Sequence, residues 1–153
     1  GNDLIYGTGG NDSILSGPTT NADDNDTVYA YEGNDSIVSG SGNDSILGGS
    51  GDDVVHGNDG SDEIFGNDGS DTLYGGTGKD TLTGGKGNDH LFGGNDDDYL
   101  FGNEEADTLY GGNGKDSLYS GAGFDYLLGG NDNDHLDAGA GNDTLRGNDG
   151  DDY

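Results

Sequence analysis

Aliphatic residues follow a fixed spacing along the chain. Ile, Val or Leu occupies sixteen positions from Ile5 to Leu145, and nearly all of these positions are nine residues apart. The few residues around each one are too short for a helix, but they suit a strand whose middle side chain points one way and whose neighbours point the other way. The pattern therefore predicts many short strands, each with one interior aliphatic side chain.

The residues between these strands repeat as well. Reading each unit as six loop residues followed by three strand residues, units begin at Gly7 and Ser16, and then at every ninth residue from Ala30 to Ala138. Only 28 of the 153 residues are Asp, so chance does not explain their placement. Position six of the unit is Asp in all seventeen units that reach it, namely Asp3, Asp12, Asp26, Asp35, Asp44, Asp53, Asp62, Asp71, Asp80, Asp89, Asp98, Asp107, Asp116, Asp125, Asp134, Asp143 and Asp152.

Glycine recurs at loop positions one, two and four. It permits positive backbone torsion angles there and lets carbonyl oxygens turn inward, so such a loop can wrap a cation. One unit supplies only a loop and a strand, so two units are needed to close a coil, and coils must stack to bury their aliphatic side chains. The expected fold is all-β, a parallel β-solenoid that forms a single domain over residues 1–153.

The composition requires something further to hold this fold together. The net charge is -28, and Leu, Ile, Val and Phe make up only about 17 % of the chain, a combination typical of disordered proteins. A polyanion repels nucleic acid and anionic lipid, no apolar run is long enough to span a membrane, and no Cys is present. Stacked carboxylates also repel one another unless a cation lies between them. Carboxylate and carbonyl oxygens in a flexible loop favour Ca²⁺ over Mg²⁺.

Three segments, 48–56 (GGSGDDVVH), 75–83 (GGTGKDTLT) and 84–92 (GGKGNDHLF), match the nonapeptide G-G-x-G-x-D-x-U-x. The chain resembles the RTX, or haemolysin-type, calcium-binding repeat family over its whole length. The resemblance implies a right-handed parallel β-roll with two repeats per coil and Ca²⁺ between stacked turns.

The resemblance also implies the ligands. A family site takes ligands from two loops. One loop provides the carbonyls of positions two and four and its Asp, and the loop two units later provides the carbonyls of positions one and three and its Asp. One such site here combines Gly49, Gly51 and Asp53 with Gly66, Asp68 and Asp71. Loop residues expected to take part are Ser39, Gly40, Ser41, Gly42, Gly48, Gly49, Ser50, Gly51, Gly57, Asn58, Asp59, Gly60, Gly66, Asn67, Asp68, Gly69, Gly75, Gly76, Thr77, Gly78, Gly84, Gly85, Lys86, Gly87, Gly111, Gly112, Asn113 and Gly114.

The number of ions follows from the two rows of Asp that alternate units form. One row is expected to hold Asp3, Asp26, Asp44, Asp62, Asp80, Asp98, Asp116, Asp134 and Asp152, and the other row the remaining eight. One ion between each pair of neighbours gives at most about 15 ions. A loop insertion at 16–23 and the residues that replace glycine at position four (Asp24, Asp96, Glu105 and Asp132) reduce the expected number to about 11 to 14 ions.

Other residues carry weaker expectations. Asn at position five, as in Asn11 and Asn34, is expected to hydrogen-bond locally in its turn. His56 and His90 fall on one sheet and His135 on the other, so the three histidines cannot meet at one metal. Outward aromatic residues either stack between coils or form a docking surface, and they are Tyr6, Tyr29, Phe65, Tyr74, Phe92, Phe101, Tyr110 and Tyr119 at position nine, with Tyr99 and Tyr126 at position seven.

No catalytic motif is present, so the chain itself is not expected to be an enzyme. The first expectation is a calcium-binding repeat domain of a secreted bacterial protein, exported by type I secretion and folding on calcium binding outside the cell or at its surface. Two alternatives stay open. The rod forms part of a self-assembling surface layer, adhesin or filament through end-to-end or lateral contacts, or it is the repeat tail of a secreted protease, lipase or pore-forming toxin. Because both ends stop inside a repeat, flanking domains of a longer parent chain are expected.

Overall fold

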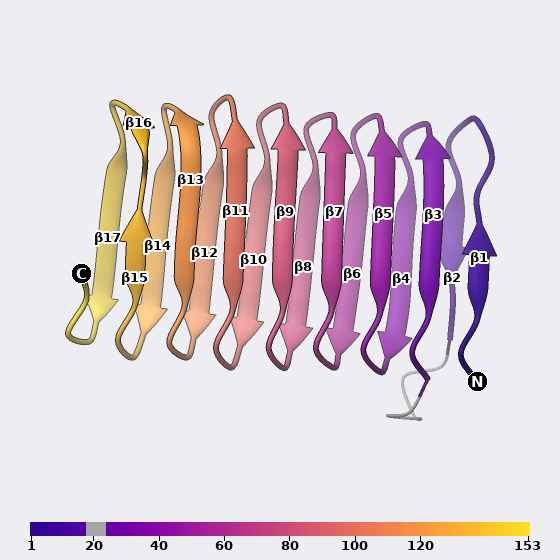
Figure 1. The fold of residues 1–153 in the computed structure, drawn as a ribbon, viewed down its shortest axis with the longest axis horizontal. Helices are drawn as coiled ribbons and strands as arrows, with labels where there is room; N and C mark the ends of the chain where they lie inside the picture. The colour runs from indigo at the N-terminus through magenta and orange to yellow at the C-terminus, as the bar shows by residue number, and fades with distance from the viewer. Residues whose placement is uncertain (18–23) are drawn as a thin grey trace.

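Two parallel β-sheets face each other in the computed structural model, which describes residues 1–17 and 24–153 (Figure 1). Successive strands of the chain alternate between the sheets, so each pair of units makes one coil. Within the described ranges there is no helix, and therefore none that is long and apolar enough to cross a membrane. The predicted all-β parallel β-roll is confirmed. The expected loop insertion at 16–23 falls mainly on residues outside those described.

The strands are short and evenly spaced in the sequence. They are β1 (Leu4–Tyr6), β2 (Ser13–Leu15), β3 (Thr27–Glu32), β4 (Ser36–Ser41), β5 (Ser45–Ser50), β6 (Val54–Asp59), β7 (Glu63–Asp68), β8 (Thr72–Thr77), β9 (Thr81–Lys86), β10 (His90–Asn95), β11 (Tyr99–Glu104), β12 (Thr108–Asn113), β13 (Ser117–Gly123), β14 (Tyr126–Asn131), β15 (His135–Asp137), β16 (Ala140–Gly141) and β17 (Thr144–Asp149).

The odd-numbered strands β1 to β15 form one sheet in sequence order, with β16 paired to β13, and the even-numbered strands β2 to β14 followed by β17 form the other. Regular neighbours are offset by 18 residues, as in the pairing of Leu91 with both Leu73 and Leu109. This register places equivalent positions of alternate units directly beside one another along the whole roll.

Most strands are twice as long as the sequence pattern predicts. They contain positions seven to nine and continue through positions one to three of the next unit, which had been assigned to the loop. In β10 the ladder pairs residues 90–92 and then 94–95, and it skips Gly93 at position one. Glycine has no side chain to obstruct the neighbouring coil, so the backbone stays close enough to keep pairing into the turn.

The core is a double ladder of position-eight side chains, as predicted. Thirteen of the sixteen are buried, and Ala30 at position one joins them. Ile5 and Leu136 are only partly buried, and Leu145 is 45 % exposed. Leu145 lies in β17, which pairs with β14 on one side only, so half of its packing surface has no partner.

Outward aromatic side chains stack from coil to coil. In the even-numbered sheet the rings of His56, Tyr74, Phe92 and Tyr110 follow one another at 4.5, 4.8 and 4.9 Å between centroids, nearly parallel. Tyr6–Tyr29 and Phe101–Tyr119 stack in the same way on the other sheet. These contacts support the stacking interpretation of position nine. The predicted placement of His135 on the sheet opposite His56 and His90 is confirmed.

Candidate metal centres in the turns

The position-six aspartates form two continuous rows, one along each edge of the roll. In each row the backbone N–H of one Asp donates to Oδ1 of the Asp in the next coil, with donor–acceptor distances from 2.7 to 3.0 Å. Asp62 thus donates to Asp80, and Asp80 to Asp98, at 2.8 Å each. The expected division into two alternating rows is confirmed as a matter of geometry.

The second carboxylate oxygen of these residues is buried and has no hydrogen-bond partner. This holds for Oδ2 of Asp26, Asp35, Asp44, Asp53, Asp62, Asp71, Asp80, Asp89, Asp98, Asp107, Asp116, Asp125 and Asp134, all of which are at most 3 % exposed. An ionised oxygen buried without a donor is costly, so a repeated row of them has the chemistry of a row of cation ligands. Asp3, Asp12, Asp143 and Asp152 lie in the outermost coils and are less buried.

In most turns that begin with glycine, a backbone carbonyl faces the Asp Oδ2 across this position-one glycine. A Cβ atom added to Gly48 would collide with Oδ2 of Asp53 and lie 3.0 Å from the carbonyl oxygen of Gly66. A Cβ atom added to Gly75 would likewise collide with Oδ2 of Asp80 and would lie 2.7 Å from the carbonyl oxygen of Gly93. Each of these turns therefore contains a small cradle in which a carboxylate oxygen and a carbonyl oxygen from the next coil converge.

This observation corrects the role assigned to the first glycine. Positions two and four adopt positive φ angles, for example 125° at Gly49 and 118° at Gly51, but the position-one glycines do not. Position one needs glycine for space rather than for its backbone conformation, because its missing side chain leaves the cradle open. Sequence reasoning missed this distinction, although the non-glycine residues Ser39 and Ser120 at position one are visible in the sequence.

Burial shifts the titration of the aspartates in the absence of metal. It raises the pKa of Asp98 to about 8, and those of Asp53, Asp62, Asp80 and Asp107 to about 7. The pKa values of Asp71, Asp89 and Asp116 rise to about 6, and those of Asp44 and Asp134 are raised by the same cause. The hydrogen bond from the preceding amide opposes each shift, and for most of them neighbouring carboxylates of the row reinforce it.

Three of the non-glycine residues at position four hold a strained backbone. Asp96, Glu105 and Asp132 have φ angles of 78°, 71° and 75°. The side chains of Asp96 and Glu105 accept hydrogen bonds from the position-four N–H of the preceding coil, at 3.2 and 2.9 Å. These bonds compensate in part for the backbone strain.

Position-five side chains act between coils rather than locally, which corrects the sequence interpretation. Oδ1 of Asn11 accepts from the N–H of Asn34 at 2.9 Å, and Oδ1 of Asn34 accepts from the N–H of Asp52 at 3.0 Å. Turns stack closely enough to bring the amide of the next coil within hydrogen-bonding distance. The position-five side chain thus accepts a hydrogen bond from the following coil, whereas the position-six side chain accepts one from the preceding coil.

Side chains alone do not complete a metal site. Across residues 1–17 and 24–153, no three His, Asp or Glu side chains converge on one point. Any bound ion must therefore take much of its shell from backbone carbonyls, which suits the hard, oxygen-rich coordination of Ca²⁺. The orphaned Oδ2 atoms and the open cradles fit such an ion.

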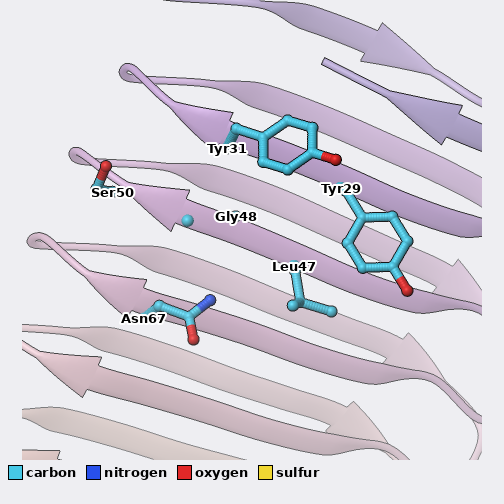
Figure 2. Close-up of a pocket in the computed structure, with 7 residues that line it drawn as sticks. Tyr29, Tyr31, Leu47, Gly48, Ser50 and Asn67 are labelled. Atoms are coloured by element: carbon cyan, nitrogen blue, oxygen red, sulfur yellow. The ribbon is translucent and has the colours of Figure 1, made fainter. Parts of the chain in front are cut away.

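A separate shallow cavity of about 230 Å³ lies on the outward surface (Figure 2). It is lined by Tyr29, Tyr31, Leu47, Gly48, Gly49, Ser50 and Asn67, and contains no position-six Asp. Tyr31 holds a φ of 82°, which is unusual for a bulky residue, and its ring lies 6.4 Å from that of Tyr29. The cavity therefore lies over strands β3, β5 and β7, beside the stacked aromatic residues.

Comparison with protein families agrees with the geometry of the turns. The model of the RTX calcium-binding nonapeptide repeat matches residues 1–18, 21–55, 47–82, 56–91, 74–109, 92–127 and 128–153. No match was found among curated proteins. The family model covers nearly the whole chain, and the turns have the carboxylate and carbonyl oxygens that calcium binding requires. The chain therefore belongs to the family of RTX calcium-binding nonapeptide repeats.

Proposed function

We propose that this calcium-binding repeat domain is part of a secreted bacterial protein. It is disordered in the low-calcium cytosol and folds into a rigid β-roll outside the cell. Extracellular calcium modules bind at about 0.1 to 1 mM, a range that separates the two compartments. Membership of a family typical of secreted bacterial proteins supports this setting.

The observation that carries the proposal is the double row of buried, unpartnered carboxylate oxygens. Stacking the coils brings ionised groups into register along each edge, and like charges in register oppose folding. A divalent cation between neighbours removes the repulsion and supplies the partner that each oxygen lacks. The same rows that prevent folding without metal would then drive it with metal.

The position-six aspartates and the loop carbonyls named above are the proposed ligands. Neighbouring turns of one edge share each ion, so that an interior Asp serves two ions. The expected content of about 11 to 14 ions per chain is retained as part of the proposal.

Circular dichroism during a calcium titration tests the proposal. We expect a disordered spectrum in EDTA and a cooperative change to β structure at about 0.1 to 1 mM free Ca²⁺. The disordered spectrum should return when chelator is added. Mg²⁺ at the same concentration is the control, because its strict octahedral shell fits the turns poorly. A chain that is equally compact and β-rich after exhaustive dialysis against EDTA would refute the proposal.

A further inference from the structure

Two turns carry serine where the cradle requires glycine. Ser39 and Ser120 occupy position one of their units, and both are fully buried. A glycine at this position leaves space between the Asp of its own turn and the carbonyl of the next coil. A serine side chain occupies that space with its methylene group and adds a hydroxyl.

The hydroxyl groups bond to the same carbonyls that face the open cradles elsewhere. Ser39 Oγ donates to the carbonyl oxygen of Gly57 at 2.8 Å, and Ser120 Oγ donates to that of Ala138 at 3.0 Å. Gly57 and Ala138 are the position-one residues two units later. In the glycine turns the equivalent oxygen belongs to Gly66 or Gly93 and faces a carboxylate across the cradle.

The turn that begins at Ser120 departs from the regular turns in its backbone too. Gly123 at position four does not adopt the positive φ of the regular turns, such as 118° at Gly51. Instead β13 extends to Gly123, and residues 122–123 pair with 140–141 of β16. Its position-four carbonyl is therefore set by a β-ladder rather than by the usual loop geometry.

We propose that the hydroxymethyl groups of Ser39 and Ser120 replace a calcium ion in their turns, so that each row crosses one metal-free junction. The inference rests on the proposed function and refines it. The junctions lie between turns 39–44 and 57–62 and between turns 120–125 and 138–143. A neutral hydroxyl satisfies the carbonyl there, and its methylene group fills the space that an ion would need. Oδ2 of Asp44 and Asp125 is buried without a hydrogen-bond partner in these turns as well, so each of these carboxylates must share the ion at the other neighbouring junction of its row.

Other residues at position one limit the inference to these two turns. Ala30 and Ala138 occupy space there but donate no hydrogen bond. Ser16 Oγ bonds to the carbonyl of Ser39 at 2.6 Å in the same manner, but its turn runs through residues 18–23, which lie outside the described part of the chain. Only Ser39 and Ser120 combine the filled space, the bonded carbonyl and a described turn.

Calcium counting on the whole chain tests the inference. Bound calcium is measured by equilibrium dialysis and atomic emission at saturating free Ca²⁺, for the wild type, S39G, S120G and the double variant. We expect each single variant to bind one more ion than the wild type and the double variant to bind two more. The Ser117→Gly variant is the matched control, because Ser117 lies at outward position seven of the same sheet, and it should leave the count unchanged.

The reverse substitution gives an independent check. Gly84→Ser places a side chain where a Cβ would collide with Oδ2 of Asp89, and we expect it to lose one ion. In crystals, calcium-edge anomalous peaks should be missing at the two serine junctions and appear there in the glycine variants. An unchanged count in S39G or S120G, or a wild-type peak at its junction, overturns the assignment for that turn. A wild type that binds no calcium refutes the proposed function itself, so the two failures are distinguishable.

Discussion

The Asp80→Asn substitution separates the metal-binding role of a buried carboxylate from its hydrogen-bonding role. Asp80 is fully buried, its Oδ1 accepts from the N–H of Asp62 at 2.8 Å, and its Oδ2 has no partner. Asparagine has nearly the same shape and keeps a carbonyl oxygen for the hydrogen bond, but it carries no charge. We therefore expect effects of opposite sign with and without calcium.

Without calcium the substitution should stabilise the roll. Burial raises the pKa of Asp80 from 3.8 to about 7, so folding the ionised group at pH 7 costs up to about 4 kcal/mol. Solvent screening at the edge of the roll reduces this to about 2 kcal/mol. Removing the charge removes that cost, because asparagine has no ionised form to desolvate.

With calcium the substitution should destabilise the roll. Asp80 lies between Asp62 and Asp98 in its row and would serve the ions on both sides. A tenfold loss of affinity at each ion corresponds to about 1.4 kcal/mol, or about 3 kcal/mol together. Asp80→Ala should cost a further 1 to 3 kcal/mol or so, because it leaves the buried N–H of Asp62 without an acceptor.

Two unfolding assays measure these effects. Urea unfolding in saturating calcium should give a lower midpoint for Asp80→Asn and a still lower one for Asp80→Ala. In EDTA, folding induced by trimethylamine N-oxide should need less osmolyte for Asp80→Asn than for the wild type. Asp52→Asn is the control, since Asp52 is exposed at position five and its Oδ1 bond to Ser70 is one that asparagine also makes. A change in stability of the same sign with and without calcium would contradict the reasoning.

Three further substitutions or conditions test other parts of the structure. In EDTA, the raised pKa values of about 6 to 8, with Asp98 the highest, mean that stability of the metal-free roll is fully present below about pH 4 and is lost as pH rises through 8. The osmolyte concentration at the midpoint of folding should therefore decrease as the pH is lowered from 8 to 5. A midpoint that does not change with pH would contradict the burial of these carboxylates. Leu91→Ala should lower the free energy of unfolding in calcium by about 2 to 5 kcal/mol, because Leu91 is fully buried, whereas Leu128→Ala on the outward face should cost much less. Gly112→Ala should prevent regular stacking and give a calcium-dependent spectrum with reduced β signal, because φ is 119° there and a Cβ would collide with the carbonyl of Gly94.

The spacing of the sequence was sufficient to predict the architecture. An aliphatic residue at position eight and Asp at position six, both in register over the whole chain, leave few alternatives to a stacked parallel roll. They also define which aspartates share an edge, as the bonds from Asp62 to Asp80 and onward show. Such long-range predictions succeed here because every contact between coils repeats a single local rule.

The chemistry inside one turn could not be predicted in the same way. The sequence treats the glycines of positions one, two and four alike, but Gly48 supplies space whereas Gly49 and Gly51 supply positive φ angles. The strand continues through Gly93 although glycine has low strand propensity, because the neighbouring coil supplies the pairing. Asn34 bonds to the next coil because stacking brings that amide close. Each of these features depends on distances between coils, which no single unit contains.

The small core of this protein cannot stabilise the fold without its charged edges. Each coil buries two aliphatic side chains, worth about 2 kcal/mol each, which is far too little to order a coil of 18 residues. The remaining free energy must come from the edges, where an interior Asp connects to the coil before it and, away from the two serine junctions, would share an ion with each neighbour. Occupation of one turn fixes the carboxylate that the next turn needs, so folding should propagate along a row once a few turns are loaded. A serine at position one lets the row continue through a junction without a metal, because the hydroxyl satisfies the carbonyl that an ion would otherwise bind. The repeat can therefore tolerate isolated substitutions at position one while keeping Asp at every position six.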